Sequence, residues 1–237
     1  MKKTFNDINK KNHKTYTKSV MLLLLLFYLI LGSTSLKAQN EMLISQLSER
    51  LVTRENFDEN GNLLNTQTFK IGKVKISEKY YEIEVETELF DKSGIATDKY
   101  TTSYRCKPEE SSTIVMVFPF YNPKKMATEI STTSKNFKEL YDLNALDDLE
   151  LEINFDSGLL NFFGSKSKIK IYDRNLSTKN STKTIRSKLN AKAYALGIRI
   201  KQFEYDVIET LNDKSLLSYQ KFTEEDGSYF TMTYKSL

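Results

Sequence analysis

Apolar and polar residues alternate along much of the chain from Leu51 onward, and this pattern predicts β-strands. In the clearest stretch, Tyr81–Leu89, apolar residues and one threonine alternate with four glutamates. A period of two is typical of a strand with one buried and one solvated face. Similar alternation occurs at Leu149–Asp156, Lys166–Tyr172 and Ile198–Val207. We therefore expect a sheet with one apolar face.

Three loops that run from an aromatic residue to a glycine lie between strand-patterned stretches. They are Phe57–Gly61, Phe90–Gly94 and Phe222–Gly227. Glycine takes the positive φ angle that tight hairpins require. With strands spaced about ten residues apart, such hairpins favour an antiparallel meander.

The middle of the chain has a different pattern. The apolar run Ile114–Phe118 predicts a buried strand that ends at Pro119, because proline cannot donate to a β-ladder. Asn122 and Pro123 predict a helix start, with the helix continuing to about Ile130. Apolar spacing predicts a second helix near residues 135–143. Residues 177–187 are rich in Ser, Thr and Lys, which predicts a mobile surface excursion.

These patterns together predict a mainly β fold. We expect a single curved antiparallel sheet, half-barrel-like, with one or two short helices packed on it. No linker or composition shift divides residues 39–237, so we expect them to form one β-rich domain.

Residues 1–38 have the pattern of a secretory signal peptide. A basic start precedes the apolar run Val20–Leu31, which is followed by small residues. This run is shorter than the about 20 residues of a membrane-spanning helix and fits the about 7–15 residues of a signal peptide. Cleavage is expected after Ala38, or alternatively after Ser35. An uncleaved signal anchor is the other interpretation. Export is thus predicted, to the periplasm, the outer envelope or the medium, without a stable transmembrane segment after processing.

The charge balance changes once this leader is set apart. The whole chain has 35 basic and 31 acidic residues, a formal net charge of +4. The leader holds seven lysines and one aspartate, so 28 basic and 30 acidic residues remain from Gln39 onward. Because the remaining basic residues form no extended stripe, we expect no nucleic-acid partner.

Several kinds of chemistry lack the residues they need. The only histidine is His13, in the leader, and the only cysteine is Cys106. Imidazole-dependent nucleophilic catalysis and zinc sites are therefore not expected, and no phosphate-binding glycine loop is present. We predict no catalytic residues, no metal and no cofactor. Cys106 is interpreted as a buried apolar residue, with an intermolecular thiol as the alternative.

Charged residues on two predicted strands have simple interpretations. Asp148, Glu150 and Glu152 fall on one strand face, which favours a solvated sheet edge. A hydrolase that uses a pair of carboxylates ranks only third among the functional hypotheses. Such an enzyme needs two carboxylates opposed across a cleft, whereas these are adjacent on one strand. The lysines of Lys166–Lys170 line another strand face, for solubility or for pairing with the glutamates of Glu82–Glu88.

An apolar concavity is the remaining candidate site. Core packing is the alternative role for each of its residues. The adjacent aromatic residues Phe162 and Phe163 lie in a predicted loop, however, and cannot easily both face a core. One of this pair is therefore expected at a groove mouth or a partner surface. The candidate ligand-binding residues are Phe118, Phe120, Phe162, Phe163, Phe203 and Tyr205.

Short segments across residues 50–237 resemble the TapB-like family of uncharacterised exported bacterial proteins. They are Phe57–Leu63, Phe90–Gly94, Tyr104–Cys106, Ile171–Arg174 and Tyr219–Leu237.

The resemblance implies a curved, mostly antiparallel sheet of a kind discussed for lipid binders and envelope components. It supplies no catalytic residues. The chain departs from the family at 189–197, which lacks the usual Pro-containing turn and second cysteine.

We therefore expect a non-enzymatic module whose sheet holds an apolar small molecule or lipid, or an envelope protein. The rival hypothesis is a structural or assembly subunit of an envelope complex that acts through its sheet edge and loops.

Overall fold

A computed structural model describes residues 47–77, 79–107, 127–132, 143–144, 146–156, 165–195 and 198–237. These residues form twelve strands of one sheet. The strands are β1 (Arg50–Phe57), β2 (Leu63–Ile71), β3 (Lys75–Ile76), β4 (Tyr81–Asp91), β5 (Ala96–Cys106), β6 (Ala127–Thr132), β7 (Leu149–Asp156), β8 (Ser165–Lys179), β9 (Thr182–Ala195), β10 (Ile198–Leu211), β11 (Leu217–Thr223) and β12 (Tyr229–Ser236).

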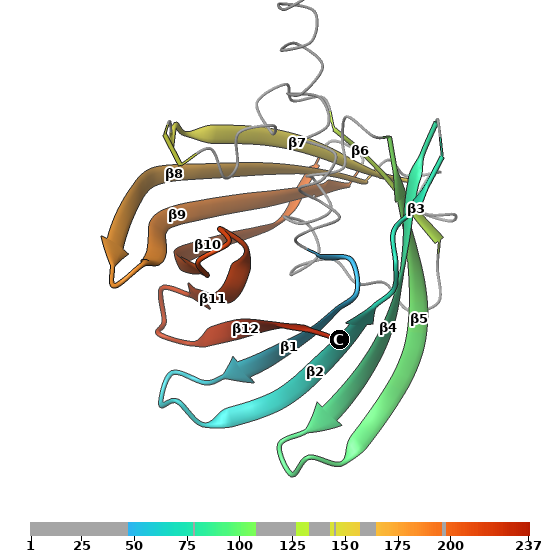
Figure 1. The fold of residues 1–237 in the computed structure, drawn as a ribbon, viewed down its shortest axis with the longest axis horizontal. Coiled ribbons are helices and arrows are strands. Elements are labelled where there is room, and N and C mark those ends of the chain that lie inside the picture. The colour runs from blue at the N-terminus through green and yellow to red at the C-terminus, as the bar shows by residue number, and fades with distance from the viewer. Residues whose placement is uncertain are drawn as a thin grey trace, which may run out of the picture. The chain divides into compact units, whose positions relative to one another are not determined.

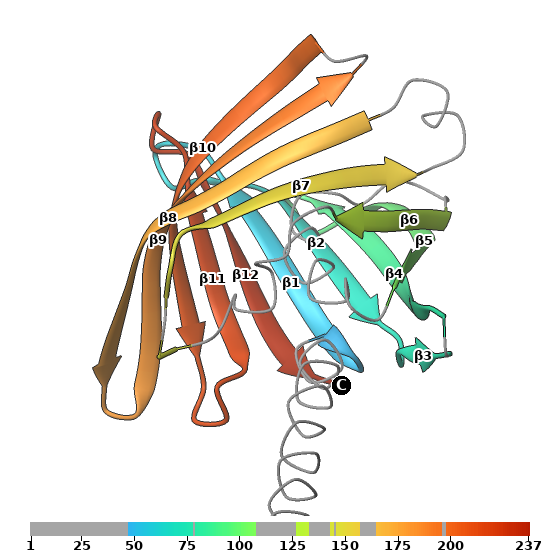
Figure 2. The same cartoon turned by 90° about the horizontal axis from the view of Figure 1, so that it is seen from above.

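The sheet is strongly curved (Figure 1), and its long strands β8, β9 and β10 lie side by side (Figure 2). The hydrogen-bonded order is β2-β1-β12-β11-β10-β9-β8-β7-β6-β5-β4-β3, and β2 also pairs with β4. The pairings between described strands are antiparallel, except that β5 and β6 run parallel over three residue pairs. The prediction of a mainly β fold with one curved antiparallel sheet is confirmed.

The glycines of the three predicted loops produce tight hairpins. Gly61, Gly94 and Gly227 have φ angles of 80°, 79° and 91°, in the region that glycine enters without steric cost. An aspartate completes each turn by accepting backbone N–H bonds. For example, Asp58 Oδ1 accepts from the backbone nitrogen of Asn62 at 2.7 Å. These hairpins join β1 to β2, β4 to β5 and β11 to β12.

Period-two alternation places the core on one face of the sheet, which we call the buried face. On β4, Tyr81, Ile83 and Val85 are buried, whereas Glu84 is exposed on the opposite, outer face. Cys106, at the end of β5, is also fully buried, as predicted. The largest fully buried side chains are Tyr104, Phe69, Leu47, Ile71, Ile83 and Leu149.

The predicted helix from Asn122 to about Ile130 is wrong where the structure describes it. Ala127–Thr132 is strand β6, which lies between β5 and β7. Thr128, Ile130 and Thr132 are β-branched and so suit an extended backbone. Pairing with β5 and β7 outweighs the local helix-start signal. In the described part of the chain, Leu47 alone has helical geometry, while Ile114–Phe118 and nearly all of 135–143 lie outside that part.

The prediction of a surface excursion at 177–187 is confirmed for its location, since residues 177–182 are exposed, but these residues form regular strand that extends β8 and begins β9. Asn180 and Ser181 form the connection with φ angles of 49° and 65°. Two consecutive positive φ angles match the twist of antiparallel strands. The Ser-, Thr- and Lys-rich composition thus belongs to a solvated hairpin.

Candidate functional site

Two of the six predicted ligand-binding residues lie in the described part of the chain. Phe203 and Tyr205 occupy alternate positions of β10 and point to the buried face, where Tyr205 is buried and Phe203 is partly buried. Their rings stack with centroids 6.2 Å apart. The other four candidates, Phe118, Phe120, Phe162 and Phe163, lie outside the described residues.

Phe203 and Tyr205 belong to an aromatic cluster that also contains Phe222 of β11 and Phe230 of β12. Phe222 and Phe230 face each other across the two strands and stack with centroids 4.6 Å apart. Tyr205 meets both edge-on, at 5.9 and 5.8 Å. Edge-to-face and offset-stacked rings attract each other beyond their burial. The sequence pattern identified Phe203 and Tyr205 as candidates. Phe222 and Phe230 lie beside them only because β11 and β12 follow β10 in the order of the sheet.

Arg54 of β1 adds a cation to this cluster. Its guanidinium lies 3.8 Å above the Phe230 ring, within cation–π range, and its Nε donates to Asn56 Oδ1 at 2.9 Å. Burial lowers the pKa of Arg54 to about 10, while the nearby Tyr205 and Glu224 act in the opposite direction. At this pKa the guanidinium remains charged at neutral pH, so the cluster combines aromatic surface with a positive charge.

A glutamate also borders the cluster, through the hydroxyl of Tyr205. The Tyr205 hydroxyl donates to Glu224 Oε1 over 3.4 Å, and burial, followed by the charge of Glu224, raises the pKa of Tyr205. Tyr205 and Glu224 also line a groove of about 230 Å³ beside the β11–β12 turn. The cluster therefore has a polar border that adjoins a surface groove.

The buried face also contains a cluster of four buried polar side chains. They are Arg50, Glu209, Gln220 and Tyr234. Gln220 donates from Nε2 to Glu209 Oε1 at 2.7 Å and accepts from the Tyr234 hydroxyl. Burial raises the pKa of Tyr234, and the charge of Glu209 raises it further. Sequence reasoning missed this group, although Glu209 and Tyr234 occupy inward positions of their strands' alternation.

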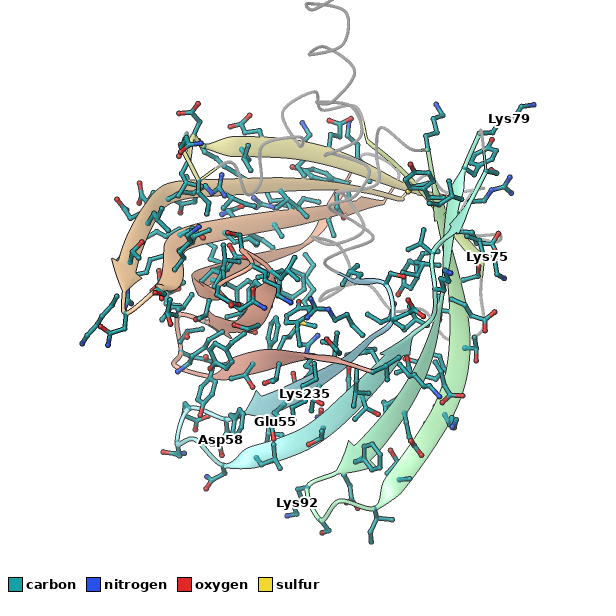
Figure 3. The ribbon with its side chains drawn as sticks, viewed as in Figure 1. Glu55, Asp58, Lys75, Lys79, Lys92 and Lys235 are labelled. Atoms are coloured by element: carbon teal, nitrogen blue, oxygen red, sulfur yellow. The ribbon has the colours of Figure 1, made fainter. Side chains whose placement is uncertain are left out.

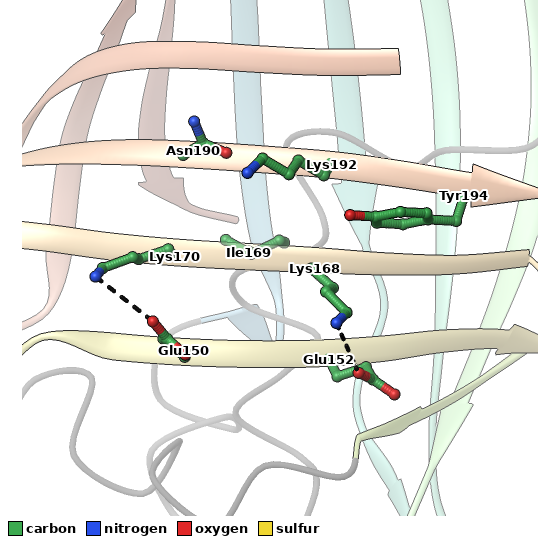
Figure 4. A pocket seen from close by; sticks show the side chains of 8 residues that line it. All are labelled: Glu150, Glu152, Lys168, Ile169, Lys170, Asn190, Lys192 and Tyr194. Atoms are coloured by element: carbon green, nitrogen blue, oxygen red, sulfur yellow. Dashed lines mark ion pairs between the residues drawn. The ribbon is translucent and has the colours of Figure 1, made fainter. Parts of the chain in front are cut away.

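The outer face of β7, β8 and β9 carries a groove of about 490 Å³ (Figure 4). Lys166 and Lys168 both reach Glu152, and Lys170 lies 3.5 Å from Glu150. The predicted pairing of these lysines with the glutamates of Glu82–Glu88 is therefore wrong. Those glutamates lie on β4, whose neighbours are β2, β3 and β5.

The predicted sheet edge at Asp148–Glu152 stays a prediction: β7 lies between β6 and β8, but its pairing with β6 covers only Ile153–Asp156, and Leu149–Glu152 pairs with β8 alone among the described strands. Glu150 and Glu152 are ion-paired to lysines of β8. Within the described ranges, no group of three or more His, Cys, Asp or Glu side chains is placed to hold a metal ion. The strands described here are accompanied by no helix long and apolar enough to cross a membrane.

Comparisons with known proteins leave the family open. No family model matches the chain, and no curated protein does. The TapB-like resemblance therefore stays a prediction.

Two solved structures have a distant likeness to the chain. One is a candidate lipoprotein from Parabacteroides distasonis, at 13% identity and a TM-score of 0.41, covering 81% of this chain and 96% of its own. The other is a candidate exported protein with a YmcC-like fold from Bacteroides fragilis, at 11% identity and a TM-score of 0.40, with the same coverage. At these TM-scores neither likeness carries an argument about the function or location of this chain.

Proposed function

We propose that the chain is an exported, non-enzymatic binding module that holds an apolar molecule at the aromatic cluster on the buried face of its curved sheet. The observation that carries this proposal is the state of Phe203, which lies at the end of the cluster and is only partly buried. Ligand sites are mostly apolar and aromatic, with a few polar groups that fix orientation. Arg54 and the pair of Tyr205 and Glu224 are such groups here.

The position of Phe203 follows from the lengths of the strands. Pairing between β10 and β11 begins at Asp206 and Thr223, so β10 extends past the end of β11 at Phe203. Among the rings of the cluster, Phe203 stacks only on Tyr205, and the ammonium of Lys201 lies 4.3 Å from the centroid of the Phe203 ring. An apolar ligand that covered Phe203 would extend the cluster and remove apolar area from water.

Binding of an apolar reporter dye tests the proposal. The protein, purified after expression of the full chain, is titrated with 1-anilinonaphthalene-8-sulfonate, and its copurifying lipids are identified by mass spectrometry. We expect Phe203→Ala to weaken dye or lipid binding at least tenfold. Leu64→Ala is the matched control, because Leu64 is an apolar residue of β2 that is 50% exposed and lies outside the aromatic cluster. Absence of dye binding and of bound lipid in the unchanged protein would refute the proposal.

One observation favours the alternative function, an assembly subunit that acts through its sheet edge. Residues 198–204 of β10 pair with β9 but have no strand partner on their other side within the described part of the chain. An exposed strand edge is a site where another chain adds a strand. Crosslinking from Gln202→Cys in intact cells tests this alternative. One dominant protein adduct would support it, and a pattern equal to that of Lys214→Cys, at the β10–β11 turn, would contradict it.

A further inference from the structure

The groove on the outer face of β7, β8 and β9 contains a like-charge contact. Lys168 of β8 and Lys192 of β9 are directly opposite each other in the antiparallel register, and both line the groove. Directly opposite residues point to the same face with Cβ atoms about 5 Å apart, and like charges there destabilise a sheet. Local conflicts of this kind are expected where a site serves a ligand.

The neighbouring carboxylates do not balance this pair. Glu152 is shared by Lys166 and Lys168, and the Lys168 contact is the longer one, at 3.9 Å. Lys170 is held by Glu150. No ion pair joins Lys192 to a described carboxylate within 4.0 Å. The groove and its border thus hold four ammonium groups against two carboxylates.

Glu204 of β10, directly opposite Asn190 of β9, is held by amides. Its Oε1 accepts from Asn190 Nδ2 and from Gln202 Nε2. Gln202, rather than an acid, is the β10 residue directly opposite Lys192. The excess positive charge is therefore carried by the adjacent strands β8 and β9.

The side chains leave room for a ligand beside these charges. In Figure 4, Lys168 and Lys170 extend toward β7, whereas Lys192 and the Tyr194 ring lie along β9 with their polar ends directed along the groove. The groove volume of about 490 Å³ exceeds the about 30 Å³ that one water occupies in the liquid by an order of magnitude. It accommodates a phosphoryl group together with part of the molecule that carries it.

We propose that this groove binds a phosphoryl group, with Lys168 and Lys192 as its counter-charges and the Tyr194 hydroxyl as a hydrogen-bond donor. A phosphate monoester carries a charge of about −1.5 to −2 at neutral pH, which matches two ammonium groups, whereas a carboxylate neutralises only one. Lysine binds phosphate as a point charge. The site is on the outer face, separate from the aromatic cluster, so it does not depend on the function proposed above.

Titration of the purified protein with glycerol 3-phosphate, followed by ³¹P NMR, tests the proposal. We expect saturable binding that weakens at least tenfold in Lys192→Gln and in Lys168→Gln. Lys92→Gln is the control, since Lys92 is an exposed lysine at the β4–β5 turn (Figure 3) and the variant loses the same charge. An equal loss in Lys92→Gln, or no saturable binding by either probe below, would overturn the proposal.

Two further arms identify the source of the phosphoryl group. Binding of glycerol 3-phosphate in solution supports a small phosphorylated molecule. Cosedimentation with phosphatidic acid vesicles, but not with phosphatidylcholine vesicles, supports a lipid headgroup. Each result supports the proposal only if Lys192→Gln weakens that binding at least tenfold.

A stability measurement separates a binding role from a structural one. Without phosphate, we expect Lys192→Gln to raise the Tm by one to a few degrees, because the repulsion from Lys168 is removed. With saturating glycerol 3-phosphate, the unchanged protein should gain stability and the variant should not. A fall in Tm of the variant without phosphate would contradict the like-charge conflict on which the proposal rests.

Discussion

Gln220 bridges two buried ionisable residues, since its amide donates to the Glu209 carboxylate at 2.7 Å and accepts from the Tyr234 hydroxyl. Glu209 and Gln220 are directly opposite each other on β10 and β11, and Tyr234 lies on β12. The amide is therefore a polar connection across three strands inside the mostly apolar buried face. A buried carboxylate depends on such partners, because burial without a hydrogen bond is costly.

Replacing Gln220 should destabilise the protein. Gln220→Leu keeps much of the side-chain volume but removes the bonds to Glu209 and Tyr234, so we expect the free energy of unfolding to fall by about 1–3 kcal/mol. Urea denaturation followed by circular dichroism measures this loss. Gln202→Leu, on the exposed side of β10, is the control, with an expected change within about 0.5 kcal/mol. Equal effects of both variants would contradict a special role for the buried amide.

The β4–β5 turn should require glycine for its backbone angle alone. Gly94 has a φ of 79°, and a Cβ there would meet no atom within 4 Å. Gly94→Ala should therefore cost only the left-handed backbone strain, about 1–2 kcal/mol. Gly94→Asn should cost less, because asparagine tolerates this region better. Thermal unfolding of both variants measures the difference, and equal losses would indicate that the turn changes conformation instead.

Acid should remove a contribution of Asp58 to stability. Hydrogen bonds from the Asn62 side chain and from backbone N–H groups lower the pKa of this carboxyl in the folded protein. Its contribution is thus present above the unfolded pKa of about 3.9 and is lost as the pH falls through the lower folded pKa.

Asp58→Asn isolates this effect, because asparagine can form a similar turn without the charge. We expect the Tm difference between the unchanged protein and the variant to shrink as the pH falls from 6 to 2. Parallel Tm curves over this range would show that the Asp58 charge does not contribute.

Cys106 should react only when the protein unfolds. Its side chain is fully buried at the end of β5, so iodoacetamide should alkylate it slowly in buffer and completely in urea. Mass spectrometry of timed samples distinguishes the two rates. Rapid alkylation in buffer would favour the alternative of an accessible thiol for intermolecular pairing.

Local patterns in the sequence predicted those parts of the fold that depend on neighbouring residues. The alternating stretch Tyr81–Leu89 lies in β4, as predicted, and the glycines at 61, 94 and 227 lie in hairpin turns. Both signals act within a few residues, because side-chain direction and φ angle are local properties. The same reasoning placed Phe203 and Tyr205 together on one face of β10.

Features that depend on strand order were not accessible from the sequence. Ala127–Thr132 is extended because β5 and β7 pair with it, and nothing within those residues specifies these partners. The lysines of β8 meet Glu150 and Glu152 because β7 is their neighbour. The contact of Gln220 with Glu209 and Tyr234 likewise requires the register of three strands.

Pairing of the first strand with the last has a consequence for the time at which the protein folds. Arg50–Phe57 hydrogen-bonds along its whole length to Tyr229–Ser236, so a nascent chain that lacks Tyr229–Ser236 cannot complete the sheet. Contacts between such distant segments form slowly because a long loop must close first. The sheet therefore stays incomplete during synthesis until Tyr229–Ser236 has been made.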